Sequence, residues 1–96
     1  MAKVKIQWSP KSLKNLEEIA EYISQNSPLY APVFVRKIVN SVERLRDFPL
    51  SGRIVPEFNN ESIREIIFHN YRVVYRTKEE TIEIVLVTHG AKLINL

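Results

Sequence analysis

Three runs rich in β-branched and aromatic residues follow one another through the second half of the chain, separated by very short segments. They span residues 63–68, 71–77 and 82–88, and each has the composition of a β-strand. A two-residue turn at His69-Asn70 joins the first two runs, because asparagine tolerates the positive φ that hairpin turns require. The polar loop Lys78-Glu79-Glu80 joins the next two. This spacing predicts an antiparallel meander of three strands.

The first half of the chain predicts one strand and then two helices. Residues 3–8 alternate apolar and polar side chains, which is the period of a half-buried strand. Ser9-Pro10 is a helix start, because serine caps the first turn and proline fits the first helical position. The first helix ends near Asn26, and its apolar stripe consists of Leu13, Leu16, Ala20 and Ile23.

The second helix is predicted to start after Ser27-Pro28 and to run to about Arg46. Pro32 lies one turn inside, so either the regular helix begins near it or the first turn is kinked. The helical hairpin ends at a cluster of turn-forming residues, Pro49, Ser51 and Gly52.

The predicted order is therefore β-α-α-β-β-β. This is an α+β fold in which an αα-hairpin packs on one face of an antiparallel-rich sheet. The length of 96 residues corresponds to a single domain, residues 1–96. The predicted core between hairpin and sheet consists of Val4, Ile6, Trp8, Leu16, Ile23, Ile38, Val42, Leu45, Ile66, Phe68, Val73 and Ile84.

The hairpin turn also sets the register of the strands. It pairs Phe68 with Tyr71 and Ile66 with Val73, and a tight second loop pairs Val73 with Ile84. A second loop two residues longer keeps the same parity. The face under the helices is then predicted to carry Ile66, Phe68, Tyr71, Val73, Tyr75, Ile82, Ile84 and Leu86. The opposite face, called the open face below, is predicted to carry Glu65, Arg72, Val74, Arg76, Glu83, Val85, Val87 and His89. Arg64 falls on the helix side near the sheet edge unless a bulge redirects it.

Composition excludes several classes of protein. The chain has no cysteine, which rules out disulfides, thiolate metal sites and a cysteine nucleophile. No apolar run approaches the roughly 20 residues of a membrane span, and the start lacks the apolar region of a signal peptide. We therefore expect a cytoplasmic protein with no membrane partner.

Familiar cofactor and metal motifs are missing as well. Gly52 and Gly90 are the only glycines, so no glycine-rich phosphate loop can exist. His69 and His89 have no adjoining carboxylates, so we expect no metal and no cofactor. The net charge of +3 permits a nucleic-acid partner without requiring one.

The polar residues that could carry chemistry are the arginines of the predicted sheet and their acidic neighbours. On a solvated sheet face such residues usually form cross-strand ion pairs, and Glu65 lies diagonal to both Arg72 and Arg76. The valines between them favour a covered surface instead, because Val85 and Val87 make this face partly apolar.

The order of short motifs along the whole chain resembles the RelE/ParE superfamily of toxins. The motifs are Trp8-Ser9-Pro10, Pro49-x-x-Gly52-Arg53, Val55-Pro56-Glu57, Ile63-Arg64-Glu65, Asn70-Tyr71-Arg72-Val73-Val74-Tyr75-Arg76 and Val87-Thr88-His89-Gly90-Ala91-Lys92. Members are toxins of type II toxin–antitoxin modules of the plasmid-stabilisation type, and they share the β-α-α-β-β-β layout. The resemblance therefore implies a hetero-oligomer with a cognate antitoxin protein.

The resemblance implies two kinds of activity, since RelE-like members cut messenger RNA on the ribosome and ParE-like members poison DNA gyrase. Metal-free RNA cleavage needs a base, a cation for the phosphate and an acid, which Glu57, Arg72 and His89 could supply. Further phosphate or RNA contacts are expected from Arg53, Arg64, Arg76 and Lys92.

The interpretation as a ribosome-dependent messenger-RNA endonuclease is favoured, but three features depart from it. Glu65 places a carboxylate among the arginines, the tail lacks the tyrosine that some members use, and residues 50–96 carry no net charge. A DNA gyrase poison and an inactive homologue that only binds antitoxin therefore stay open as alternatives.

Overall fold

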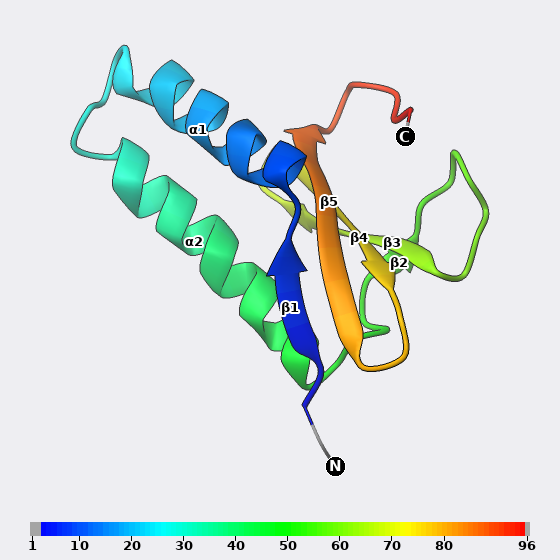
Figure 1. Ribbon diagram of the computed structural model, residues 1–96. Helices are drawn as coiled ribbons and strands as arrows, with labels where there is room; N and C mark the ends of the chain where they lie inside the picture. The colour runs from blue at the N-terminus through cyan, green and yellow to red at the C-terminus, as the bar shows by residue number, and fades with distance from the viewer. Residues whose placement is uncertain (1–2, 96) are drawn as a thin grey trace.

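A computed structural model describes residues 3–95. Two helices form an antiparallel hairpin that covers one face of the sheet (Figure 1). Within the described residues the sheet has five strands in the order β1-β5-β4-β3-β2, with β1 parallel to β5 and the other neighbours antiparallel. The elements are β1 (Lys5–Trp8), α1 (Pro10–Ser24), α2 (Ala31–Glu43), the 3₁₀ turn η1 (Arg44–Arg46), β2 (Arg53–Ile54), β3 (Ile63–Phe68), β4 (Tyr71–Thr77) and β5 (Thr81–His89).

This architecture confirms the predicted α+β fold and adds one strand to it. The extra strand, β2, is only two residues long and pairs with β3 through Arg53 with Glu65 and Ile54 with Arg64. This strand was not predicted, because it is only two residues long and directly follows a cluster of turn-forming residues.

Both helices start where their local chemistry requires. The Ser9 hydroxyl oxygen accepts the N–H of Ser12 at 3.0 Å, and Pro10 occupies the first turn of α1. Helix α2 begins at Ala31 with Pro32 in its first turn, so the regular helix begins near the proline, as one of the two predicted alternatives requires. Its last turn tightens into η1, which carries the buried Leu45.

The core lies between the hairpin and the sheet. Half of the predicted core residues are buried there, together with Tyr75, which is 0% exposed. The confirmed residues are Leu16, Ile38, Val42, Leu45, Val73 and Ile84. The others pack against this core but stay partly exposed, because they lie on or just before the edge strand β1, on the rim of α1 or toward the open edge of β3: Val4, Ile6, Trp8, Ile23, Ile66 and Phe68.

The predicted register of β3 with β4 is confirmed, including the pairs Phe68 with Tyr71 and Ile66 with Val73. The positive φ of the two-residue turn falls on His69, at 53°, and not on Asn70 as expected. The His69 ring packs edge-on against Phe68 with ring centroids 4.5 Å apart. This contact accompanies the unusual backbone conformation of a non-glycine residue.

The register of β4 with β5 changes halfway along the strands. Tyr75 pairs with Ile84, as the longer-loop version of the prediction requires, but Val74 pairs with Leu86. The extra residue, Val85, makes a β-bulge that reverses the parity of every later position. Leu86 therefore lies on the open face, while Val87 joins the core under the helices. The predicted faces of Leu86, Val87 and His89 were wrong for this reason.

The open face is covered by protein. Val74 and Leu86 pack there with Val55 from the β2–β3 connection and with Ile94 from the segment after β5. Val55 is 0% exposed and Ile94 is 6% exposed. Both covering segments lie on the side of the sheet away from the helices (Figure 1). They form a second, smaller core that buries the residues around Arg72.

Candidate functional site: a buried arginine cluster

Arg72, in the middle of this covered face, uses all five of its N–H groups on protein acceptors. Its Nε donates to Glu65 Oε1 at 2.6 Å, and its Nη2 donates to Glu65 Oε2 at 3.1 Å and to Glu57 Oε1 at 2.8 Å. Its Nη1 donates to Glu57 Oε2 at 2.7 Å and to the Lys92 carbonyl at 3.3 Å. Because a guanidinium has five donors, none is left for a ligand in this arrangement.

Glu57 connects Arg72 to the segment after β5. Its side chain is 18% exposed, and its Oε2 also accepts the backbone N–H of Ile94 at 3.1 Å. The hydrogen bonds from Arg72 and then from Ile94, which outweigh the cost of desolvation, lower the pKa of Glu57 to about 2. A carboxylate with so low a pKa is a weak general base at neutral pH.

Glu65 is the most deeply buried member of the cluster, with a side chain that is 0% exposed. Besides Arg72 it accepts the Nε of Arg53 at 2.7 Å, and the Arg53 side chain itself is 59% exposed. The predicted diagonal pair with Arg72 is confirmed, but Arg76 pairs with Glu83 instead, at 3.8 Å. Two carboxylates and two guanidiniums leave the cluster without net charge. The same contacts, with Glu57 first, raise the pKa of Arg72 further above its ordinary value.

Arg64 serves the backbone near the sheet edge, on the side of the sheet where the register placed it. Its Nη1 donates to the carbonyls of Gly52 at 3.0 Å and Leu50 at 3.3 Å, and its Nε donates to the Glu61 carbonyl at 3.0 Å. The Tyr75 hydroxyl holds the same loop, since it donates to the Pro49 carbonyl at 2.8 Å and accepts the N–H of Gly52 at 3.0 Å.

His89 lies apart from Glu57, because the bulge turns it to the helix side. Its ring contacts Tyr71 with centroids 5.9 Å apart, and its Nδ1 accepts the N–H of Ala91 at 3.3 Å. His89 still borders a hollow of about 400 Å³ at the end of the hairpin, the distal hollow, which Arg53 and Arg72 also line. Of the expected phosphate contacts, Arg76 is 43% exposed at its side chain and Lys92 is exposed.

The structure thus brings Glu57, Arg72 and Arg53 together through Glu65, and leaves Arg64 and Arg76 elsewhere. His89 is separated from Glu57 but borders the distal hollow with Arg53 and Arg72. Sequence reasoning missed the role of the segment after β5, whose backbone at Lys92 and Ile94 completes the cluster. The sequence offered only one hint, the apolar Ile94 beyond the last strand, since Leu93 beside it is 84% exposed.

Two negative findings apply to residues 3–95. No cluster of three or more histidine, aspartate or glutamate side chains there could hold a metal ion. No helix in the same part of the chain is long and apolar enough to cross a membrane.

A family model described as the ParE toxin of the type II toxin-antitoxin system parDE matches residues 6–94. The chain therefore belongs to the ParE toxin family, which confirms the resemblance to the RelE/ParE superfamily. It is 32% identical over 92 residues to Y4kP of Sinorhizobium fredii, covering 94% of this chain and 92% of the relative. It is 28% identical over 87 residues to Toxin RelE2 of Caulobacter vibrioides, covering 90% and 94% of the two chains.

A solved structure shares the fold. A chain of the chromosomal ParDE toxin–antitoxin system from P. aeruginosa superposes with a TM-score of 0.76 at 20% identity. The match covers 91% of this chain and 96% of that one. At this identity the likeness concerns the fold alone.

Proposed function

We propose that this chain is a type II toxin that arrests growth by binding a protein target of the DNA gyrase kind, and that a cognate antitoxin restrains it. One observation carries the choice of target. Glu57 and Arg72, two of the residues expected to carry metal-free RNA cleavage, bind each other. Every N–H of Arg72 has a protein acceptor, and Glu57 is one of those acceptors. Such an arrangement builds a rigid surface more readily than a catalytic centre.

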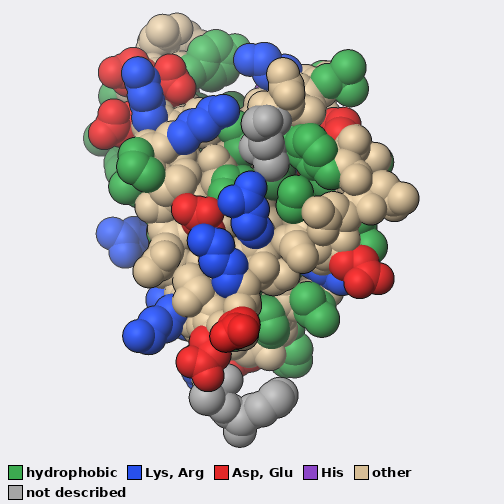
Figure 2. Space-filling view, turned by 45° about the vertical axis from the view of Figure 1, so that its right-hand side comes forward, with side chains coloured by type: hydrophobic (Ala, Val, Ile, Leu, Met, Phe, Trp, Pro, Cys, Tyr) green, Lys and Arg blue, Asp and Glu red, His purple; other side chains and the backbone are tan. Residues whose placement is uncertain are grey.

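The surface charge supports the same choice. Positive and negative side chains are interspersed on the face that Figure 2 shows, without a field of one sign. Binding to ribosomal or messenger RNA depends largely on lysine and arginine side chains that neutralise phosphates, and the face in this view is poorly suited to that.

The ribosome-dependent messenger-RNA endonuclease is the second candidate, and one observation favours it. His89 is exposed at the distal hollow, its Nδ1 accepts from Ala91, and Arg53 lines the same hollow. An acid and a cation could therefore meet a phosphate there, provided that Arg53 exchanges its contact with Glu65.

Inducing the protein in cells without its antitoxin separates the two activities. Early failure of replication, with DNA trapped on gyrase, is the expected result, and the variants Glu57→Gln and His89→Gln should remain toxic. Purified chain added to gyrase and, separately, to translating ribosomes gives the matching assay in solution. Cleaved messages that vanish in both variants would overturn the gyrase proposal and favour the nuclease.

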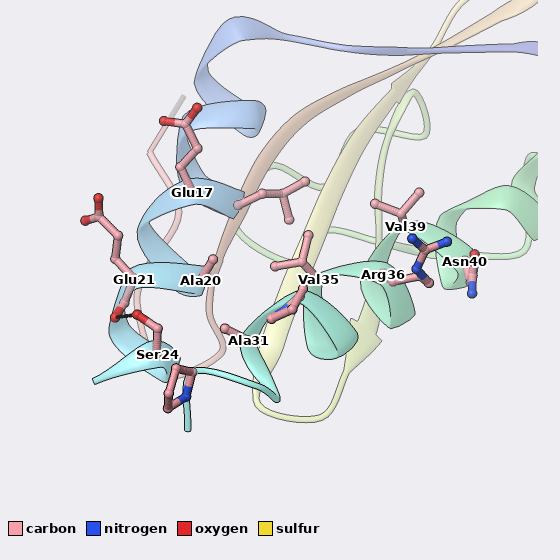
Figure 3. A pocket seen from close by; sticks show the side chains of 12 residues that line it. Glu17, Ala20, Glu21, Ser24, Ala31, Val35, Arg36, Val39 and Asn40 are labelled. Carbon is pink, nitrogen blue, oxygen red and sulfur yellow. Dashed lines mark hydrogen bonds between the residues drawn. The ribbon is translucent and has the colours of Figure 1, made fainter. Parts of the chain in front are cut away.

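We propose that an antitoxin helix lies in the groove between the two helices, and Figure 3 shows the side chains that line this groove. The groove has a volume of about 750 Å³ and an apolar floor that includes Ala20, Val35 and Val39. Glu17 and Glu21 stand on its α1 wall and Arg36 lies on its α2 side (Figure 3). An amphipathic helix could lay its apolar stripe in such a groove.

A charge placed in the floor tests this contact. Val35→Glu should abolish co-purification with the cognate antitoxin, because it buries an unpaired carboxylate in the complex. Lys37→Glu on the outer surface of α2 is the control and should still co-purify. Equal capture of both variants would contradict this placement of the antitoxin.

A further inference from the structure

Three aromatic rings lie between two adjoining hollows at the end of the β3–β4 hairpin, away from the groove between the helices. The first hollow has a volume of about 450 Å³ and lies between α1 and the end of β5. The second, of about 370 Å³, lies beside the hairpin turn and has Asn70 in its lining. Tyr22, Tyr71 and His89 line both hollows and so form their common boundary. These three residues are called the aromatic cluster below.

The aromatic cluster is built on a rigid support. The Tyr71 ring packs edge-on against Phe34, with ring centroids 5.8 Å apart, and Phe34 belongs to the core beneath the helices. The same ring meets His89 edge-on, with centroids 5.9 Å apart. Helix α1 is tied to β5 at this point, because Asn15 Oδ1 accepts the N–H of Val87 at 3.0 Å. The two elements that carry the cluster are therefore fixed relative to each other.

Tyr22 is the exposed member of the tyrosine pair, at 68%. Burial, and then the nearby phenol of Tyr22, raise the pKa of Tyr71, so the Tyr71 hydroxyl stays protonated at neutral pH and can donate a hydrogen bond. Tyrosines with few rotatable bonds offer a large contact area at little cost in entropy, and they are enriched among the residues that anchor protein interfaces. A pair of them on a rigid support is suited to contact with another protein.

The charges around the cluster indicate the chemistry of the partner. Lys92 and Glu18 both line the first hollow. Arg53, whose side chain is 59% exposed, lines the distal hollow, which shares His89 with the cluster. Two cations against one carboxylate favour an acidic partner. They are too few and too far apart to follow the successive phosphates of a single-stranded nucleic acid, whose binding depends on many such contacts.

We propose that the aromatic cluster is the surface through which the chain contacts its protein target, and that the target presents an acidic segment with a protruding apolar side chain. The apolar side chain enters the hollow beside Asn70 and packs against the rings of Tyr22 and Tyr71. The tyrosine hydroxyls donate to oxygen atoms of the segment, and Lys92 binds one of its carboxylates. This assignment rests on the function proposed above.

The target surface and the antitoxin groove use different faces of α1. Glu17 and Glu21 line the groove, whereas Glu18 and Tyr22 line the hollow next to β5. A substitution at Tyr22 therefore changes the surface assigned to the target and leaves the groove intact. Contact with the target and contact with the antitoxin can thus be measured separately on one variant.

Binding of the purified chain to purified gyrase free of DNA measures the contact directly. Tyr22→Ala should weaken binding about tenfold or more, because truncation removes an aromatic anchor from the interface. The variant should still co-purify with the antitoxin, which shows that it is folded. Tyr30→Ala is the matched control, since Tyr30 is a tyrosine that is 42% exposed and lines neither hollow. It should bind gyrase like the unmodified chain.

A reversal of charge tests the acidic character of the partner. Lys92→Glu should weaken binding to gyrase several-fold, and the loss should shrink as the salt concentration is raised. Lys78→Glu makes the same change of charge in the loop at the opposite end of β4 and β5, so it should weaken binding much less. Equal losses in the two variants would contradict a local contact at Lys92.

The assignment is overturned if gyrase binds the unmodified chain and the Tyr22→Ala variant equally well. It is also overturned if short single-stranded DNA or RNA, or a second copy of the chain, binds in a way that Tyr22→Ala abolishes, because the occupant would then be of another kind. If gyrase does not bind the unmodified chain at all, the function proposed above fails, and this assignment fails with it. The first result is therefore distinct from the last.

Discussion

Glu65 and Arg72 form a buried ion pair across β3 and β4, with Arg72 Nε 2.6 Å from Glu65 Oε1 and the two side chains 0% and 7% exposed. The sequence predicted the pair and the strand positions of both residues. It left open whether this face is solvated, where ion pairs contribute little, or covered, as the valines around it favour. Burial makes the contact structural, because a carboxylate inside a protein is tolerated only with its partner.

Arg72→Gln should lower the free energy of unfolding by about 3 kcal/mol, because it leaves the buried carboxylate of Glu65 with Arg53 alone. Arg76→Gln, which loosens an exposed 3.8 Å contact with Glu83, should cost at most about 1 kcal/mol. Urea denaturation of the two variants measures the difference. Equal small losses would show that the Arg72 cluster does not stabilise the fold.

The stability of the chain should fall in acid partly through Glu57. Its pKa is about 2 in the folded chain, against an ordinary value of 4.5. A lowered pKa means that the ionised carboxylate stabilises the folded state above about pH 4.5, and that this contribution is lost as the pH falls toward 2. Glu57→Gln cannot titrate, so its free energy of unfolding should decline less steeply over that interval. Parallel curves for the two proteins would contradict the prediction.

Gly52→Ala should destabilise the fold by about 1–3 kcal/mol. A Cβ at this position would lie 2.5 Å from the Tyr75 hydroxyl oxygen and 2.7 Å from the backbone carbonyl oxygen of Glu65. The backbone atom cannot move aside without shifting β3. Gly90→Ala is the matched control, since its nearest contact would be the Asn70 carbonyl oxygen at 3.1 Å. Thermal melting should show a clearly larger loss for Gly52→Ala than for Gly90→Ala.

Val73→Ala should cost about 1–3 kcal/mol, because Val73 is 0% exposed beneath the helices and its removed methyl groups leave a cavity. Val33→Ala, on a side chain that is 45% exposed, should change stability by less than about 0.5 kcal/mol. Chemical denaturation tests both. A neutral Val73→Ala variant would mean that the sheet face assigned to the core is wrong.

The helices and the β3–β4 hairpin followed from sequence because their signals are local. The serine–proline start of α1 and the alternation around His69-Asn70 act within a few residues. The bulge at Val85 has no such signal, because it lies inside the apolar run Ile84-Val85-Leu86-Val87, which contains no glycine or proline. It was this single residue that separated His89 from Glu57 in the predicted site.

The closure of the open face also depends on contacts far apart in the sequence. Ile94 reaches Val55 and Val74 only once the sheet has formed, and the N–H of Ile94 finds Glu57 across the same space. The segment after β5 has no periodicity that would predict these contacts of Ile94. Local sequence patterns therefore could not predict that Arg72 is buried, although the predicted chemistry required it to be accessible.

Because of the bulge, β5 contributes side chains to both cores. Ile82, Ile84 and Val87 belong to the core beneath the helices, while Val85 and Leu86 belong to the smaller core on the far side. Since one continuous strand is shared between them, neither core can come apart without disturbing the backbone of the other. The arginine cluster is therefore held in place by the packing of both cores, although the segment that completes it, at Lys92 and Ile94, is short.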